Sequence, residues 1–246
     1  SDLMAFKRTF TDKMPPKIES GLDKNGVTTL HGSAKFIGKN IIAVDGKTRL
    51  QAKKILIATG AKPRKIDVPG AQYLIDSTEF LELESLPKKI LFVGGGFISF
   101  EFANIAARAG SDVHIIDRGE RPLKGFDPDL VDKLLERSKE VGIEVVQKTN
   151  LISIAQEDSG YSVTLDVDGK TQKYSADLIV HGAGRVPAID GLDLGKAGVE
   201  SNAHGVKVNE FLQSISNPSI YAAGDAADTK GAPLTPVAVF EGKVTA

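Results

Sequence analysis

The sequence predicts an α/β protein built around a doubly wound, Rossmann-like unit that also carries an antiparallel β meander. Two observations predict this fold. Residues 89–117 read as a short apolar strand, three glycines, a helix with apolar residues at three- and four-residue spacing, and a second apolar strand. Residues 151–176 alternate between apolar and polar positions, with turn signals at 158–160 and 168–169. That alternation is typical of a three-stranded meander.

The segment 89–117 has the spacing of a βαβ dinucleotide-binding site. Gly94 permits a tight turn, and Gly96 lets the backbone approach a pyrophosphate at the positive end of the following helix. Asp117 lies 23 residues after Gly94, where an acid accepts hydrogen bonds from an adenine ribose. Ser99 occupies the place of the third glycine, and we expect its small side chain to fit. The alternative is a glycine-rich turn in an α/β protein without a cofactor.

Composition excludes several classes of function. A chain of 246 residues with 41% apolar and 26% charged residues is enough for one large or two ordinary globular domains. Its 31 basic and 32 acidic residues form no long run of one sign, so nucleic acid and anionic membranes are not expected as partners. Without a membrane-spanning or signal-like stretch, we expect a cytoplasmic location. The absence of cysteine and the scattered histidines argue against thiol chemistry and a metal site in these residues.

The first sixty residues predict helix and then small β elements. Residues 1–24 read as a polar helix interrupted at Pro15-Pro16, and residues 27–57 as short strands with a hairpin turn at Asp45-Gly46. The ILIATG run at 55–60 predicts a buried strand that enters a glycine turn. We expect a domain boundary near residue 62, where prolines and a glycine follow.

Capping signals predict two further helices, and strand patterns complete the chain. Residues 76–86 predict a short helix capped by Asp76 or Ser77, with Glu79 in its first turn. A longer helix begins at Asp127-Pro128. The remaining expectations are an apolar stripe on that longer helix (Leu130, Leu134, Leu135, Val141), a parallel-type strand at 143–147, a strand–glycine–acid segment at 219–228 and a helix after residue 233.

The order of five motifs, ATGAKP, VGGGFISFEFA, GAGRVPA, YAAGDAAD and LTPVAVFEG, resembles the flavin-dependent pyridine nucleotide–disulfide oxidoreductases. This family includes glutathione reductase, dihydrolipoamide dehydrogenase and mercuric reductase. The resemblance covers residues 27–246. It implies that residues 1–61 are the second part of an FAD-binding domain, that 62–185 form an inserted NAD(P)-binding domain, and that 186–246 return to the FAD-binding domain. The family's first glycine motif with its CxxxxC pair and its C-terminal interface domain are not represented, which implies a fragment.

The resemblance implies hydride transfer from NAD(P)H to FAD and then to a disulfide-type acceptor, either a small molecule or a protein. It implies a homodimer for the intact protein, whereas the fragment alone would be inactive and could be monomeric. Two alternatives remain open. One is an NADH oxidase-like flavoprotein, and the other is a non-catalytic nucleotide-binding module.

The resemblance also assigns residues on the nicotinamide side. The family's phosphate loop falls on the run Gly94, Gly95, Gly96, Phe97 and Ile98. Phe97 occupies the place of a tyrosine that covers the flavin, and its alternative role is a buried core aromatic. Glu101 is an acid on an apolar helix, where a carboxylate is costly unless paired. The resemblance implies that it lies near the nicotinamide and the flavin, paired with a lysine from the part that is not represented. Its alternative role is that of a surface acid.

Cofactor choice depends on the end of the second strand and the loop that follows it. Asp117 suits the free ribose hydroxyl of NADH, whereas Arg118 and Lys124 resemble a basic clamp for the 2′-phosphate of NADPH. The balance favours NADPH slightly, and the alternative is that both basic residues are surface charges. A turn that closes the nicotinamide site is assigned to Ala183, Gly184 and Arg185, with Ala188 in place of the family's asparagine.

On the flavin side, the resemblance assigns residues from four segments. Asp225 matches the acid that binds the ribityl chain, and Leu234 with Thr235 matches the helix start that faces the flavin pyrimidine. Ala34 matches a backbone position near the adenine. Thr59 and Gly60 match the junction between the two domains.

Overall fold

The computed structural model describes residues 2–245, and it shows a mixed α/β protein, as the sequence predicts. Its contacts divide the chain into two compact units. The first, called here the inserted unit, runs from Pro63 to Gly184. The second, called the flanking unit, combines the chain before Pro63 with the chain from Arg185 onward. Each unit is described by itself below.

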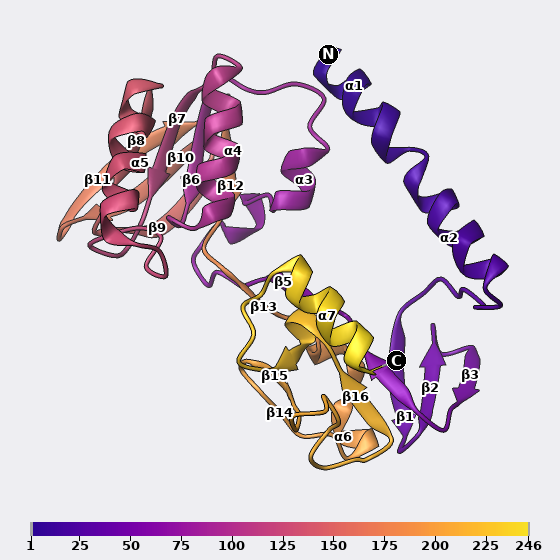
Figure 1. The fold of residues 1–246 in the computed structure, drawn as a ribbon. Coiled ribbons are helices and arrows are strands. Elements are labelled where there is room, and N and C mark those ends of the chain that lie inside the picture. The colour runs from indigo at the N-terminus through magenta and orange to yellow at the C-terminus, as the bar shows by residue number, and fades with distance from the viewer. Residues whose placement is uncertain (1, 246) are drawn as a thin grey trace. The chain divides into compact units, whose positions relative to one another are not determined.

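The inserted unit is built on a parallel sheet of four strands in the order β12–β6–β7–β8. Helices α4 and α5 cover one face of this sheet, and a meander with the strand order β11–β10–β9 covers the other (Figure 1). The bounds are β6 (Lys89–Val93), α4 (Phe97–Arg108), β7 (Asp112–Ile116), α5 (Pro128–Glu140), β8 (Ile143–Val146), β9 (Thr149–Gln156), β10 (Tyr161–Val167), β11 (Lys170–Ala176) and β12 (Leu178–His181).

Two apolar clusters flank the parallel sheet, because alternate residues of each strand point to opposite faces. On the helix side, Phe92 and Ile115 pack with Phe100 and Ala103 of α4. On the meander side, strand residues such as Leu91 pack against the inward side chains of β10, including Val163 and Leu165. The central strands are therefore apolar on both faces, as expected for a covered parallel sheet.

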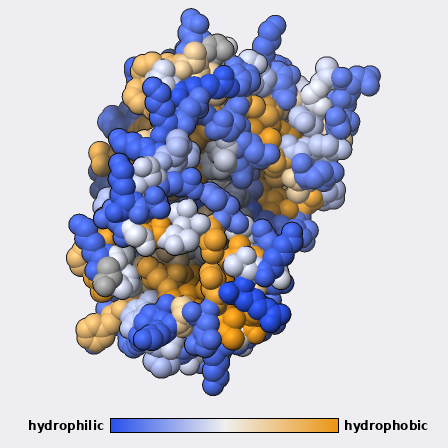
Figure 2. All heavy atoms as spheres, turned by 90° about the vertical axis from the view of Figure 1, so that its right-hand side faces the viewer, coloured by the Kyte–Doolittle hydropathy of each residue, from blue (hydrophilic) through white to orange (hydrophobic). Residues whose placement is uncertain are grey.

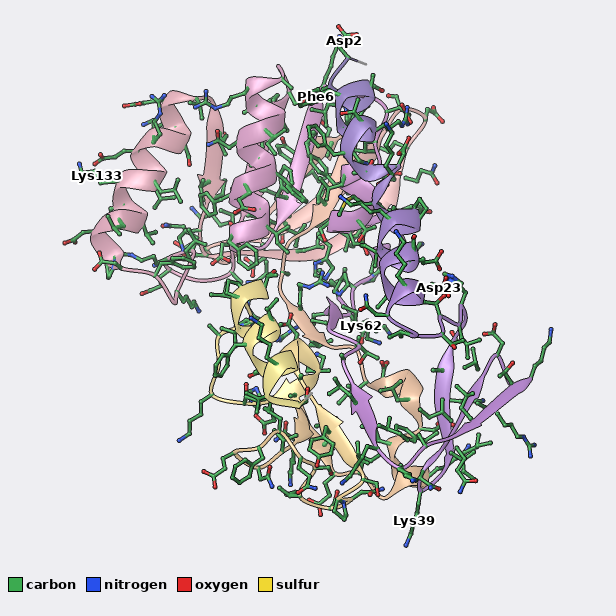
Figure 3. All side chains as sticks on the ribbon, turned by 45° about the vertical axis from the view of Figure 1, so that its right-hand side comes forward. Asp2, Phe6, Asp23, Lys39, Lys62 and Lys133 are labelled. Carbon is green, nitrogen blue, oxygen red and sulfur yellow. The ribbon has the colours of Figure 1, made fainter. Side chains whose placement is uncertain are left out.

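Local signals placed the helix starts correctly. Before α3 (Ser77–Leu81), which follows the 3₁₀ turn η1 (Ala71–Tyr73), Asp76 and Glu79 form a reciprocal capping box. Asp127 caps α5, whose first residue is a proline. The expected stripe on α5 was wrong at one position, since Leu130 is 70% exposed and Val131 is the buried residue. Lys133 projects outward from the same helix and pairs with Glu136 (Figure 3).

The two predicted Asp-Gly hairpin turns are confirmed. Asp45 and Gly46 have φ values of 49° and 68°, and they join β2 (Ile41–Val44) to β3 (Thr48–Gln51). Asp168 and Gly169 have φ values of 50° and 81° between β10 and β11. Positive φ at both central residues gives the turn a twist that matches the flanking strands.

The flanking unit contains the antiparallel sheet β1–β2–β3, the mixed sheet β14–β15–β17, the parallel pair β4–β16 and the short pair β5–β13. Strand β4 pairs in parallel with β16, and Ile55, Ile57, Ile220 and Ala222 lie in its core. Its strands and turns are β1 (Ala34–Gly38), β2, β3, β4 (Ile55–Ile57), β5 (Ala61–Pro63), β13 (Arg185–Pro187), η2 (Asp190–Leu192), β14 (Ser201–Asn202), β15 (Gly205–Lys207), β16 (Ile220–Ala222), η3 (Gly224–Ala226) and β17 (Ala227–Asp228). Its helices are α1 (Asp2–Thr11), α2 (Met14–Lys24), α6 (Leu194–Ala197) and α7 (Thr235–Thr245).

The predicted break in the N-terminal helical segment is confirmed, since α1 ends at Thr11 and both prolines lie in the first turn of α2. Figure 3 labels Asp2 and Phe6 on α1 and Asp23 on α2. Apolar side chains on these two helices are exposed, among them Phe6, which is 63% exposed. Figure 2 shows one face of the surface, on which apolar patches are separated by hydrophilic side chains. No helix in residues 2–245 is both long and apolar enough to cross a membrane.

Candidate functional site

The glycine turn after β6 lies against two other segments of the inserted unit. Gly94 has a φ of 104°, and a Cβ atom built on it would come within 2.5 Å of the Cα atom of Ala183. A Cβ atom on Gly95 would come within 2.6 Å of the Cβ atom of Pro122. The turn therefore touches the chain that leaves β12 and the loop that follows β7. All three segments meet at the carboxyl edge of the parallel sheet, where such folds bind ligands.

The start of α4 presents unpaired backbone donors. Gly96 is the N-cap, and no side chain caps the helix. In the described part of the chain, no acceptor pairs with the amide groups of Gly96, Phe97 and Ile98. Together with the positive end of the helix dipole, these groups form an environment suited to an anion. The predicted strand–turn–helix geometry is thus present, while nucleotide binding by these residues stays a prediction.

The carboxylate of Asp117 accepts two backbone hydrogen bonds, which its position in the motif does not predict. Its Oδ2 atom accepts a hydrogen bond of 2.8 Å from the amide of Gly95, and its Oδ1 atom accepts one of 2.8 Å from the amide of Gly119. The carboxylate therefore fixes both the glycine turn and the loop after β7. Since a carboxylate has about four acceptor sites, it can still accept from a ribose.

The loop after β7 carries three cations, of which one is already used. Arg121 pairs with Asp132 of α5 at 3.0 Å. Arg118 and Lys124 are exposed and form no ion pair within residues 2–245. Lys124 lies over Gly119, since a Cβ atom there would be 2.9 Å from its Cε atom. The two cations proposed from the motif therefore lie on the loop held by Asp117 and are available to an anion.

Ser99 does not block the turn, because Gly182 makes room for it. Ser99 is fully buried, and a Cβ atom on Gly182 would come within 1.9 Å of its Oγ atom. In the usual dinucleotide-binding motif, a glycine at the position of Ser99 lets the helix pack closely on the sheet. Here Gly182, which follows β12, provides that space instead. The Oγ atom itself has no hydrogen-bond partner in the described chain, which is a costly arrangement for a buried hydroxyl.

His181 is one of the scattered histidines for which no metal-binding role is expected, and it has a structural role, since it fixes the segment that Gly94 touches. Its Nδ1 atom accepts a hydrogen bond of 3.1 Å from the amide of Ala183, so its proton lies on Nε2, which donates to the carbonyl of Arg64 at 2.5 Å. The neutral ring thereby joins the first residues of the inserted unit to its last turn. No motif signals this role, because the partner is 117 residues away.

We predict that His181→Ala destabilises the protein by about 1–3 kcal/mol, since an amide and a carbonyl each lose their partner. Amide hydrogen exchange at Ala183 should accelerate more than exchange in the centre of β6. His204→Ala, at an exposed position, is the control and should change the unfolding free energy by less than about 0.5 kcal/mol. Unchanged exchange at Ala183 in the first variant would show that the ring does not hold the turn.

Two predictions about α4 need correction. Phe97 is 51% exposed, so its alternative role as a buried aromatic is wrong. Glu101, one turn further along α4, is also exposed. Its carboxylate can therefore be hydrated by solvent, and the expectation that it needs a partner because it is buried is wrong for this structure. Ile105, 47% exposed, continues the same face. These three exposed positions on α4 are therefore apolar apart from the carboxylate of Glu101. The roles assigned to Phe97 and Glu101 stay predictions.

In the flanking unit, two of the predicted flavin segments meet at one edge. Because β4 and β16 are parallel neighbours, the turn at Thr59 and Gly60 and the turn at Asp225 both follow carboxyl ends of adjacent strands. Asp225 is half-buried in η3, and Thr59 is exposed. Ala34 lies elsewhere, as the exposed first residue of β1 in a different sheet. Arg185 donates to the carbonyl of Ala61 within this same unit, whereas Ala183 and Gly184 belong to the inserted unit.

Helix α7 is attached to the Asp225 turn by a residue that the sequence did not single out. Glu241 is 7% exposed, and its carboxylate accepts hydrogen bonds from the amide of Gly224 at 2.7 Å and the hydroxyl of Thr229 at 2.8 Å. The predicted helix start at Leu234 and Thr235 is exposed. A buried acid near a helix end is a signal that could have been noticed, since such a group requires partners.

The chain is similar to known proteins along most of its length. Residues 4–242 match the family described as pyridine nucleotide-disulphide oxidoreductase. The chain belongs to this family. The resemblance that the five motifs predict is thus confirmed, together with the α/β fold.

Several members of the pyridine nucleotide-disulphide oxidoreductase family are similar along most of the chain. Glutathione reductase of Nostoc sp. is 37% identical over 238 residues, which cover 92% of this chain and 51% of that protein. Mercuric reductase of Staphylococcus aureus is 33% identical over 228 residues, with 92% and 41% covered. The solved structure of the HOCl-induced flavoprotein disulfide reductase RclA from Escherichia coli superimposes with a TM-score of 0.82 at 25% identity, with 92% and 51% covered.

The chain therefore spans about half the length of the relatives it matches. The family description names a pyridine nucleotide, and the RclA structure is described as a flavoprotein, in agreement with the cofactors that the motifs predict. The assignment of individual cofactor-binding residues in this chain stays a prediction.

Proposed function

We propose that the inserted unit binds NADP(H) or NAD(H) at the glycine turn between β6 and α4, with a preference for NADP(H). The observation that carries this proposal is the turn at Gly94, where any side chain would overlap Ala183 and where the following amides have no partner. The amides of Phe97 and Ile98 would donate to the pyrophosphate. The helix dipole would offset part of its charge.

The preference for a 2′-phosphate rests on the charge balance of the loop after β7. Arg118 and Lys124 supply two cations without ion-pair partners in the described chain. Asp117 would repel a phosphate if its charge were uncompensated, but two backbone amides already donate to it. Hydrogen bonds to a carboxylate offset part of its charge. This arrangement favours NADP(H) over NAD(H) modestly.

In the intact protein we propose hydride transfer from NAD(P)H to FAD, and from there reduction of a disulfide-type acceptor. When bound, the nicotinamide supplies the hydride and the flavin accepts it. The residues of the flanking unit fit part of a flavin site, since Asp225, Thr59 and Gly60 share one strand edge and Glu241 fixes the turn that carries Asp225. Phe97 and Glu101 would line the nicotinamide side from the exposed face of α4.

The acceptor would be a small-molecule or protein disulfide, and the thiols that reduce it would come from outside these residues, which contain no cysteine. Relatives named glutathione reductase and mercuric reductase support this class. We also propose a homodimer for the intact protein and a cytoplasmic location, where NAD(P)H is available as reductant.

Nucleotide titrations of residues 1–246 test the proposal. We expect NADP⁺ to bind about tenfold more tightly than NAD⁺, and Arg118→Ala to weaken NADP⁺ by about tenfold while leaving NAD⁺ unchanged, because only NADP⁺ carries the phosphate. Isothermal titration calorimetry measures both constants.

Arg137→Ala is the matched control, since it removes the same charge from an exposed position on α5 where the guanidinium pairs with Glu140. It should leave both affinities unchanged. Weak, equal binding of the two nucleotides that is insensitive to Arg118→Ala would contradict the phosphate clamp. Absence of binding by either nucleotide would contradict the site itself.

A further inference from the structure

The connection between β8 and β9 holds the loop that follows β7. The backbone amide of Lys148 donates to the carbonyl of Gly119 at 3.0 Å, and the amide of Thr149 donates to the carbonyl of Asp117 at 2.9 Å. Because β7 and β8 are parallel neighbours, the segments that follow them meet at the carboxyl edge of the sheet, where such folds bind ligands. Lys148 therefore lies beside the loop that carries the proposed phosphate clamp.

The backbone of Lys148 is fixed in a conformation that is unfavourable for lysine. Its φ is 50°, in the left-handed region, where a residue with a Cβ atom is strained. Besides the bond from its amide to Gly119, its carbonyl accepts a hydrogen bond of 3.0 Å from the amide of Asp168. Strain of this kind persists where neighbouring contacts enforce it, and it is concentrated at ligand sites. Glycine would adopt the conformation without strain, so the backbone does not explain why a lysine is present.

The side chain of Lys148 pairs with the carboxylate that lies within the clamp loop. Its Nζ atom is 3.5 Å from the Oε1 atom of Glu120, and Glu120 lies in sequence between Arg118 and Lys124. The side chains of Glu120 and Lys148 are 87% and 52% exposed, so the pair itself contributes little to stability. Its effect is on the charge of the loop. Glu120 alone would repel a phosphate bound there, and the ammonium group of Lys148 offsets that repulsion.

The net charge around the clamp depends on Lys148. Residues 117–124 and their ion-pair partners in the described chain, Asp132 and Lys148, include four cations and three carboxylates. Without Lys148 these charges balance. A phosphate monoester carries roughly 1.5 to 2 negative charges at pH 7, so it gains from each additional cation nearby. NAD(H) lacks the 2′-phosphate, and its affinity should not depend on Lys148.

We infer that Lys148 is a specificity-determining residue for NADP(H), because it offsets the charge of Glu120 beside the 2′-phosphate. This inference rests on the nucleotide site proposed above. It adds to the clamp of Arg118 and Lys124 a cation from the segment that follows β8. No motif signals this residue, since its pairing with Glu120 depends on the neighbouring positions of β7 and β8 in the sheet.

Replacement of Lys148 by methionine removes the charge and keeps a long, flexible side chain. At low ionic strength, we expect calorimetry on residues 1–246 to show about threefold weaker binding of NADP⁺ and unchanged binding of NAD⁺. At ~1 M salt the effect should disappear, because charges are then screened beyond about 3 Å. Lys148→Arg keeps the charge and should keep the affinity for NADP⁺. A loss that persists at high salt, or that affects NAD⁺ equally, would reveal a structural effect and overturn the inference.

Glu120→Gln tests the same charge pair from the other side. It leaves the charge of Lys148 without an opposing carboxylate in the loop, so NADP⁺ should bind about threefold more tightly. The double variant with Lys148→Met lacks both charges and should bind NADP⁺ as the unaltered protein does. If Glu120→Gln weakened NADP⁺ binding instead, the pair would act by holding the loop in place, and the assignment of Lys148 would be wrong.

Two further variants separate this inference from the proposal on which it rests. Lys89→Met removes an equal charge from the exposed first residue of β6, at the opposite edge of the sheet, and should leave both affinities unchanged. Arg118→Ala tests the phosphate clamp itself. If Arg118→Ala weakens NADP⁺ binding and Lys148→Met does not, only the role of Lys148 is overturned. If neither variant weakens it, the clamp is overturned as well.

Discussion

Replacement of Gly94 by alanine is expected to destabilise the protein by about 2–5 kcal/mol and to abolish nucleotide binding. Two effects add. Alanine is strained at a φ of 104°, at a cost of about 1–2 kcal/mol. Its Cβ atom would also lie 2.5 Å from the Cα atom of Ala183 and 2.6 Å from its nitrogen, and such overlap with backbone typically costs about 1–3 kcal/mol. Because backbone must move, the turn at the start of α4 would open. Urea unfolding and an NADP⁺ titration measure the two consequences.

Gly110 provides a matched control for the conformational part of this effect. It has a φ of 99°, close to that of Gly94, but a Cβ atom on it would meet nothing within 4 Å. Gly110→Ala should therefore cost only about 1–2 kcal/mol and should leave NADP⁺ affinity unchanged. If both variants lost the same stability, contact with Ala183 would contribute nothing, and the packing of the glycine turn described above would be wrong.

Gly182→Ala is expected to destabilise the protein by about 2 kcal/mol, and Ser99→Gly is expected to cancel most of that loss. A Cβ atom on Gly182 would lie 1.9 Å from the Oγ atom and 3.2 Å from the Cβ atom of Ser99. In the double variant both atoms are absent, and the glycine returns to the position that the fingerprint predicts. A double-mutant cycle should therefore give a coupling energy of about 2 kcal/mol.

Ser99→Ala separates the hydroxyl from the clash. It removes a buried oxygen that has no partner in the described chain, and it should stabilise the protein by about 1 kcal/mol. Gly195→Ala is the control for the glycine replacement, since it is exposed and a Cβ atom there has no neighbour within 4 Å. Its effect should be additive with that of Ser99→Gly. A Gly182→Ala variant that Ser99→Gly fails to rescue would show that another contact limits this position.

Features decided by neighbouring residues could be predicted from sequence. The capping box of Asp76 and Glu79 joins residues three positions apart, and the hairpin turn at Asp45-Gly46 depends on φ values that this pair adopts readily. The meander follows from its period-two alternation. The prediction of which side of α5 is buried was less reliable. A small rotation of the helix about its axis exchanges Leu130 for Val131 at the sheet, and only the tertiary structure shows that Val131 is the buried residue.

Features decided by distant residues could not be predicted. The motif places Asp117 near a ribose, but the structure shows its carboxylate bound to the amides of Gly95 and Gly119. Similarly, the exposure of Phe97 and Glu101 on α4 could not be inferred from their apolar neighbours along the helix. In both cases, a side chain's surroundings depend on which other segments pack beside it.

The sequence by itself determined the family, the order of strands and helices, and the glycine turn that the proposed nucleotide site uses. These properties reside in short motifs and in local periodicity, which act through the preferences of adjacent residues. Only the tertiary structure decided that Gly182 makes room for Ser99, that His181 joins Arg64 to Ala183, and that the buried hydroxyl of Tyr174 has no hydrogen-bond partner within residues 2–245. Such contacts join residues far apart in the chain, so they exist only once the sheet brings its strands and loops together.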